Sequence, residues 1–300
     1  MRNDKLLNYL HLHFIVFIWG FTAVLGALIS LEAIPLVWYR MLLATGFVFL
    51  FLKFRGENLR FSLKTLAGYA LGGIIIALHW LTFFGAIKAS NVSVTLAVLS
   101  TGAFFASLLE PLFYGRRIIL YEVLFGLIVV AGLYIIFDVE ASYALGIGLA
   151  LLSAFLSALF SVINGKFVQR QKASAISFYE LLFGVFGITI FLAATGRFTT
   201  EFFTVSAHDW IYLGILASAC TAYAFIASIH VMKWISPYTV MLTINMEPVY
   251  GIILALLILG DSEKMGPQFY YGAIIILLTV ITNGIIKITQ ERKRKRLSKT

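Results

Sequence analysis

Ten long runs of apolar residues divide this chain of 300 residues, and they limit its fold more than any other feature. Each run spans about 19–24 residues, the length that an α-helix needs to cross a hydrocarbon layer about 30 Å thick. Charged residues make up 12% of the chain, whereas soluble domains hold about 25%. The sequence therefore predicts an all-α polytopic membrane protein with ten transmembrane helices. The runs lie near residues 12–31, 35–53, 66–87, 92–114, 118–137, 144–164, 175–195, 210–232, 237–260 and 268–287.

Lysine and arginine are shared unevenly between the loops. If the N-terminus is placed inside, most of the 23 Lys and Arg residues fall on the inner side, including the basic tail of residues 287–299. Cytoplasmic loops carry such an excess, so both termini are predicted to be cytoplasmic and the protein to lie in the inner (plasma) membrane. The net charge of +9 is concentrated in this tail, and it indicates contact with the lipid bilayer rather than with nucleic acid.

The ten runs form two sets of five, and in each set long predicted helices alternate with short loops. Lys88 and Lys233 each end a third run, Gly115 and Gly260 each end a fourth, and both pairs are 145 residues apart. Five is an odd number of crossings, so the two sets must enter the membrane with opposite orientation. We therefore expect two inverted repeats, residues 1–140 (helices 1–5) and 141–300 (helices 6–10 with the tail), with a site near the midplane between them.

A carboxylate and a proline lie in the middle of the ninth run, at Glu247 and Pro248. A charge at the membrane centre costs about 2.5–3.5 kcal/mol on insertion scales, and Pro248 leaves the carbonyl one turn earlier without its helical partner. One interpretation is a kinked, packed helix whose Glu hydrogen-bonds to a neighbour. The other, which we favour because intramembrane carboxylates are usually functional, is a helix that lines a wet cavity.

Several segments match the pattern of a known family. They are Phe17-Ile-Trp19-Gly20 in the first run, Trp38-Tyr39-Arg40 in the second, residues 100–116 in the fourth, and Asn245-Met-Glu-Pro248-Val-Tyr-Gly251 with Gly260-Asp261 in the ninth. With these residues the chain resembles the EamA-type ten-helix exporters of the drug/metabolite transporter superfamily. It departs from their pattern at Ala103, where the first half lacks the proline. The resemblance implies a secondary transporter that exports small metabolites, such as amino acids or related amphiphilic compounds, by alternating access around a midplane cavity.

Polar and aromatic side chains deep in the runs are the candidates for substrate binding or coupling. Glu247 is the central one; it would bind a cationic group or exchange a proton, and uncoupled facilitated diffusion is equally allowed. His79 is alternatively a packing residue, and the polar stripe that ends at Asn164 is alternatively a close helix contact. The predicted set is Glu247, Asn245, Tyr250, His79, Trp80, Trp19, Tyr223 and Asn164, with Pro248 as the helix kink.

Arg40 lies a few residues inside the second run, near the predicted outer surface. A long basic side chain there is expected to reach the interface or to pair with an outer acid such as Asp209. The alternative is that Arg40 attracts a substrate carboxylate at the outer mouth of the pathway. The aromatic residues at the ends of the runs are expected to form the interfacial belt of a membrane protein.

Two more acids lie near the inner ends of runs. Glu180, in the seventh run, is expected to be neutralised by Lys166 or Lys172. Glu110, in the fourth run, is expected to form an ion pair with the arginines at 116–117. Both pairs would lie at the inner rim, where water lowers the cost of the charges.

Signatures of catalysis and of metal binding are missing from the sequence. It holds no glycine-rich phosphate loop, nucleophile elbow, paired acidic motif or metal-ligand spacing. We therefore predict that the protein is not an enzyme and needs no cofactor or metal, and that its partner is a small-molecule substrate; its oligomeric state stays open. The alternatives are an importer of a sugar, nucleotide or vitamin, and a membrane enzyme or scaffold that does not transport. Anionic nucleotides are disfavoured because Arg40 and Lys88, near the outer rim, are the candidate basic groups.

Overall fold

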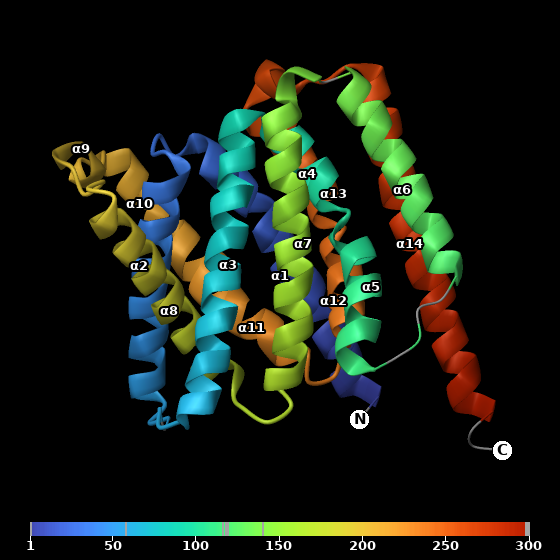
Figure 1. Cartoon of the computed structure of the whole chain (residues 1–300), viewed down its shortest axis with the longest axis horizontal. Coiled ribbons are helices and arrows are strands. Elements are labelled where there is room, and N and C mark those ends of the chain that lie inside the picture. Colours follow the sequence, from blue (N-terminus) through green and yellow to red (C-terminus); the bar gives the residue numbers. More distant parts are fainter. Residues whose placement is uncertain (1, 58, 116, 118–119, 140, 298–300) are drawn as a thin grey trace.

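The structure is a computed structural model of the chain, and it describes residues 2–57, 59–115, 117, 120–139 and 141–297 (Figure 1). All regular secondary structure in this described part is helical. The helices are α1 Arg2–Leu28, α2 Ala33–Phe54, α3 Leu63–Ala89, α4 Val92–Leu99, α5 Gly102–Tyr114, α6 Leu120–Val139, α7 Ala144–Phe167, α8 Ala173–Ala194, α9 Thr200–Phe203, α10 Ala207–Ala217, α11 Ala224–Val231, α12 Pro237–Ile244, α13 Glu247–Ile258 and α14 Pro267–Leu297. Short 3₁₀ segments, Ala141–Tyr143 and Gly260–Glu263, and a π-helical segment, Ser218–Tyr223, complete them.

Eight helical stretches are long and apolar enough to cross a membrane, counting each of α4–α5, α10–α11 and α12–α13 as one. They confirm eight of the ten predicted crossings by length and composition. The predicted crossings near 118–137 and 268–287 fall on α6 and α14, which pack along each other at one side of the bundle (Figure 1). Their apolar stretches within the described residues, 124–136 and 267–283, are shorter, so these two crossings stay a prediction.

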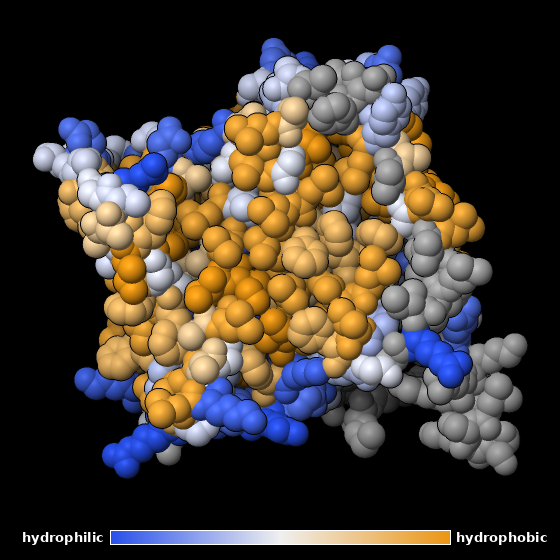
Figure 2. Space-filling model, in the orientation of Figure 1, coloured by the Kyte–Doolittle hydropathy of each residue, from blue (hydrophilic) through white to orange (hydrophobic). Residues whose placement is uncertain are grey.

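On the face seen in Figure 2, a broad apolar band lies between hydrophilic residues at the upper and lower ends. On α3, for example, Leu71, Ile74 and Leu78 are exposed. Such a continuous apolar surface is suited to lipid rather than to water. Both termini lie at the same end of the bundle (Figure 1), and which side of the membrane that end faces stays a prediction.

Two of the predicted crossings are interrupted helices. The ninth run divides between Ile244 and Glu247, because Pro248 has no N–H to offer the Ile244 carbonyl. Pro248 therefore lies in the first turn of α13, and the interruption predicted at this proline takes the form of a break just before it, between Ile244 and Glu247. The fourth run, for which no interruption was predicted, divides at Ser100–Thr101 without any proline.

The interrupted helices match each other across the chain. Their breaks, at Ser100 and Asn245, are 145 residues apart, as are the residues that cap them. Asn91 accepts a hydrogen bond from the Val94 N–H (2.8 Å), and Ser236 accepts one from the Thr239 N–H (3.3 Å). The two helices run in opposite directions, with α4 beside α13 and α5 beside α12 (Figure 1). Both breaks thus lie in the interior of the bundle, where Ser100 and Asn245 are buried.

A carboxylate from each interrupted helix caps the start of the other. Glu263, just after α13, accepts hydrogen bonds from the N–H groups of Val92 (3.1 Å) and Ser93 (2.8 Å) at the start of α4. Glu110 of α5 accepts one from the Tyr238 N–H (3.0 Å) at the start of α12. Helix N-termini carry free N–H groups and partial positive charge, which these carboxylates satisfy. Glu110 thus serves as a helix cap. The rim ion pair predicted for it stays a prediction, because Arg116, one of its two predicted partners, lies outside the described residues.

Replacing Glu263 by alanine is expected to destabilise the protein, because it leaves two buried N–H groups of α4 without an acceptor. Each such group costs about 1–3 kcal/mol, so we expect a clear fall in the Tm of the detergent-solubilised protein. The matched control is Asp261→Ala in the same segment, where Asp261 is exposed and pairs with Lys264. Equal losses of Tm in the two variants would contradict the capping role.

Candidate functional site

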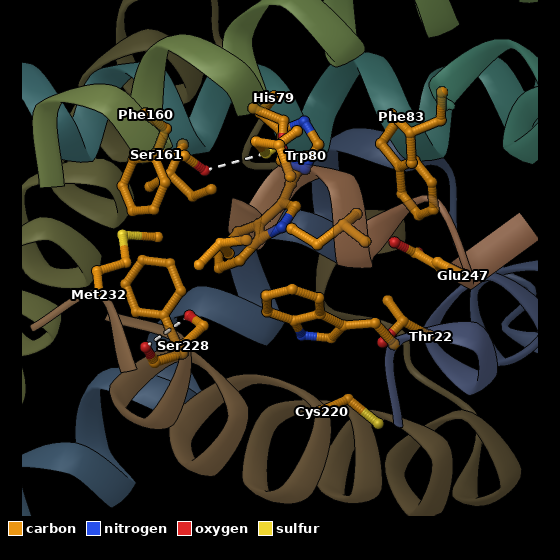
Figure 3. A pocket seen from close by; sticks show the side chains of 18 of the residues that line it. Thr22, His79, Trp80, Phe83, Phe160, Ser161, Cys220, Ser228, Met232 and Glu247 are labelled. Atoms are coloured by element: carbon orange, nitrogen blue, oxygen red, sulfur yellow. Dashed lines mark hydrogen bonds between the residues drawn. The ribbon is translucent and has the colours of Figure 1, made fainter. Parts of the chain in front are cut away.

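A cavity lies between the two helix breaks and α1, α2, α3, α7 and α11 (Figure 3). Its walls are mostly apolar and aromatic, with a few polar groups, as is usual for small-molecule sites. The polar lining residues are Thr22, Arg40, His79, Ser157, Ser161, Cys220, Ser228 and Glu247. The aromatic ones are Trp19, Trp80, Phe83, Phe160 and Phe225.

Glu247 reaches this cavity because α13 begins at it. The side chain is 6% exposed, and its carboxylate points into the cavity on the side where Thr22 also lies (Figure 3). No side chain in the described part of the chain forms a hydrogen bond or an ion pair with this carboxylate. A carboxylate without a partner in a mostly apolar cavity is costly, so Glu247 is available to a ligand or to a proton.

Arg40 brings a guanidinium group into the same cavity. It is 1% exposed; its Nε donates a hydrogen bond to Thr221 Oγ1 (2.6 Å), and its Cζ lies 4.0 Å from the centre of the Trp80 ring. The buried Nη1 has no hydrogen-bond partner among the described residues. Arg40 also feels the charge of Glu247, although the two side chains do not form a direct ion pair.

The position of Arg40 contradicts the predicted contact with the outer acid Asp209. The Asp209 carboxylate instead accepts hydrogen bonds from the Ser30 N–H (2.8 Å), from the Ser30 hydroxyl (2.6 Å) and from the Ser206 hydroxyl (2.8 Å). Arg40 is drawn inward by Thr221, which lies in the π-helical segment between α10 and α11. A π turn inserts one residue into a helix and is frequent at functional sites, and sequence hydropathy gives no sign of it.

His79 connects α3 to α7 at the cavity wall. Its Nδ1 lies 2.9 Å from the Ser153 carbonyl oxygen and 2.8 Å from the Ser153 hydroxyl. Because a carbonyl only accepts, the tautomer with the proton on Nδ1 fits this contact, which is an inference from geometry. His79 is therefore both a packing residue and a lining residue. In the predicted polar stripe of α7, Ser157 and Ser161 line the cavity as well.

The structure brings together four of the eight predicted site residues, namely Trp19, His79, Trp80 and Glu247. The other four lie elsewhere. Tyr250 packs against Phe17, with ring centres 5.5 Å apart, and Asn245 is buried at the end of α12 outside the lining. Tyr223 is 43% exposed and bonds to the ring of His11 (2.8 Å), and Asn164 bonds to Glu180.

Sequence reasoning missed the central place of Arg40 and the lining role of Thr22, Cys220 and Ser228. The signal for Arg40 was present, because it belongs to the Trp38-Tyr39-Arg40 segment that carried the family resemblance. Within the described residues, no cluster of His, Cys, Asp and Glu has the composition to hold a metal ion. The cavity thus presents one guanidinium, one carboxylate and aromatic faces to a small molecule.

Known proteins resemble this chain along most of its length. A 27% identical protein of Archaeoglobus fulgidus, named an uncharacterized transporter, matches 205 residues, which are 67% of this chain and 69% of that protein. Another uncharacterized transporter, from Clostridium kluyveri, is 26% identical over 156 residues, 52% of this chain and 47% of its own. A crystal structure with 15% identity shares the fold, with a TM-score of 0.68 over 93% of this chain and 98% of its own.

The family model of the EamA-like transporters matches the chain twice, at residues 8–138 and 144–284. The two matched segments contain all the helices that line the cavity, with α1 to α4 in the first and α7 to α13 in the second. The chain therefore belongs to the EamA-like transporter family.

Proposed function

We propose that the protein is a secondary transporter of small zwitterionic metabolites, such as amino acids or related amphiphilic compounds, with the cavity as its substrate site. The observation that carries this proposal is the pair of opposite charges, Arg40 and Glu247, which line one cavity without pairing with each other. Charges buried without partners are expensive, and a zwitterion with a carboxylate and an ammonium group satisfies both of them.

Each end of such a substrate finds suitable chemistry in the cavity. The free Nη1 of Arg40 can donate to a carboxylate, and a guanidinium bonds to carboxylates with strong, directional hydrogen bonds. Glu247 can accept from an ammonium group, and the faces of Trp19 and Trp80 can cover either a cation or an apolar side chain. His79 and the serines of α7 remain for hydrogen bonds to other parts of the substrate.

The wider architecture supports alternating access. The antiparallel pair of interrupted helices, with breaks 145 residues apart, is expected of two inverted repeats that rock about a midplane site. Inner-membrane location, cytoplasmic termini and export are parts of the same proposal. An importer of nucleotides fits less well, because Glu247 would repel phosphates. A neutral sugar or vitamin would leave both charges unpaired.

Flux measured in proteoliposomes tests the proposal. We expect the purified protein to move zwitterionic amino acids from a mixed pool of amino acids, sugars, nucleotides and vitamins, with each compound quantified by mass spectrometry. Loading the pool inside or outside in turn, under opposite gradients, reports the preferred direction. Empty liposomes are the control. Flux of sugars or nucleotides without any flux of amino acids would contradict the proposed substrate class, and no flux of any compound would contradict transport.

A further inference from the structure

A second acid is buried in the membrane-spanning bundle, away from the cavity. Glu180 of α8 is 0% exposed and does not line the cavity. Asn164 of α7 donates a hydrogen bond from Nδ2 to Glu180 Oε1 (3.0 Å), whereas Glu180 Oε2 has no partner. The predicted neutralisation by Lys166 or Lys172 was wrong, because Lys166 donates to the Phe113 carbonyl (2.5 Å) and Lys172 pairs with Glu57 (3.5 Å).

Other buried polar atoms without partners lie on the helices around this acid. They are the Tyr69 hydroxyl of α3, the Asn164 Oδ1 of α7 and the Ser177 hydroxyl, which lies one turn before Glu180 on α8. Tyr69 is within electrostatic reach of Glu180 and stacks on Tyr179, with ring centres 5.9 Å apart. Buried polar atoms without a hydrogen-bond partner are rare in proteins, so several of them on the helices that pack around Glu180 point to a role for this region beyond packing.

Charged groups on the helices that pack against α8 do not compensate Glu180. Arg40 of α2 bonds to Thr221, and His79 and Lys88 of α3 bond to Ser153 and to the Ile29 carbonyl. The remaining ones, Lys53 of α2, Lys64 of α3 and His230 of α11, are exposed. No cation in the described part of the chain therefore forms an ion pair with this carboxyl group. Glu247 differs, because it shares its cavity with Arg40.

Two glycines of α3 allow this helix to pack closely against α8 at Glu180. A methyl group on Gly72 would collide with the Glu180 carboxyl group, and one on Gly73 would collide with the Glu180 carbonyl oxygen and the Gly184 nitrogen. The two backbones thus touch at this point, as small residues allow in membranes. They belong to different matched segments of the chain, α3 to the first and α8 to the second. Glu180 is closed off from water in this arrangement, and a separation of α3 from α8 would open its carboxyl group to water.

We propose that Glu180 is a proton-binding site that couples transport to a pH gradient, an inference that rests on the proposed transporter function. In the packed arrangement the carboxyl group holds a proton on Oε2, which removes the cost of a buried charge and supplies a donor. When α3 and α8 separate, the O–H bond breaks, the proton passes to water and Glu180 is left as a solvated carboxylate. Glu247 binds substrate, so coupling and substrate recognition fall on two different acids.

The first test detects the proton on Glu180 directly and does not depend on a transport measurement. Infrared spectroscopy of the full chain in lipid at neutral pH is expected to show the carbonyl stretch of a protonated carboxyl group that is lost in Glu180→Gln. Glu201→Gln, at an exposed glutamate, is expected to keep the band. A wild-type spectrum without any band that depends on Glu180 would overturn the inference.

The second test separates coupling from transport in proteoliposomes. We expect Glu180→Gln to lose accumulation driven by a pH gradient while substrate counterflow stays within about twofold of wild type, and Glu180→Asp, which keeps a titratable group, to retain part of the driven accumulation. Pairs of runs with sodium replaced by potassium test whether sodium is the coupling ion, and we expect equal accumulation in both. Retained pH-driven accumulation in Glu180→Gln would overturn the proton site and leave the transporter intact, whereas absence of counterflow in wild type would count against the proposed function itself.

Discussion

Replacing Arg40 by lysine is expected to lower the transport of a zwitterionic substrate about 10-fold to 100-fold, which corresponds to the loss of one charged hydrogen bond worth about 1.5–3 kcal/mol. The guanidinium of Arg40 makes three kinds of contact available: its Cζ lies over the Trp80 ring, its Nε donates to Thr221, and its Nη1 has no partner among the described residues. A lysine ammonium is a compact charge that cannot hold this arrangement. Counterflow of a labelled amino acid in proteoliposomes measures the effect.

The matched control for this prediction is Arg55→Lys. Arg55 follows the same helix, is exposed, and keeps its guanidinium 6.0 Å from the ring of Phe51. The Arg55→Lys variant should transport the amino acid at the wild-type rate. A second comparison uses the decarboxylated amine of the same amino acid, whose transport should respond less to Arg40→Lys because it has no carboxylate to lose. Equal losses for the amino acid and the amine would show that Arg40 supports the structure of the cavity instead of binding the carboxylate.

The helices themselves were predictable because crossing a membrane demands long apolar runs. Hydropathy, however, records which side chains tolerate lipid and does not record backbone hydrogen bonds. The break at Ser100–Thr101 has no proline and lies in an apolar run, so nothing in the sequence indicated an interruption there. The break before Pro248 had a chemical signature, and the missing detail was only that the helix ends before the proline, at Ile244.

The site was half predictable for a related reason. Trp19, Trp80, His79 and Glu247 were identified because they lie far from the ends of their apolar runs. A polar or aromatic side chain at mid-membrane has to be shielded from the lipid by other parts of the protein. Depth does not reveal which neighbour a helix face meets. Tyr223 was misplaced because it ends the π-helical segment, where the turn has an extra residue and the face of the helix shifts.

The partner of Glu180 was also misjudged, because proximity in sequence was taken for proximity in space. Glu180 lies in the second turn of α8, so a lysine in the adjoining loop was the natural partner. In the fold, Glu180 packs against two glycines of α3. This contact joins segments that lie about 100 residues apart in the sequence. A pattern of residues within one segment of the sequence cannot predict such a contact between helices of the two halves.

Replacing Glu247 by glutamine is expected to change which charge the cavity prefers. Glutamine keeps the shape of the side chain and removes its negative charge, which leaves Arg40 as the charged group of the cavity. Zwitterions lose the partner of their ammonium group, so their counterflow should fall at least about tenfold. Simple carboxylates without an ammonium group lose a repulsive neighbour instead, so their transport should rise relative to wild type. The measurement is counterflow of an amino acid and of the matching carboxylate without the amino group.

The direction of this change separates binding from damage to the fold. A variant that merely disturbs the cavity should transport both compounds less well, whereas loss of a specific charge should move them in opposite directions. Glu201→Gln, a like substitution at an exposed glutamate, should change neither. If Arg40 and Glu247 hold the two ends of one substrate, the double variant Arg40→Lys with Glu247→Gln should lose less than the sum of the two single losses, because each single change already releases the substrate. Strict additivity of the two losses in this cycle would mean that the charges act on separate steps.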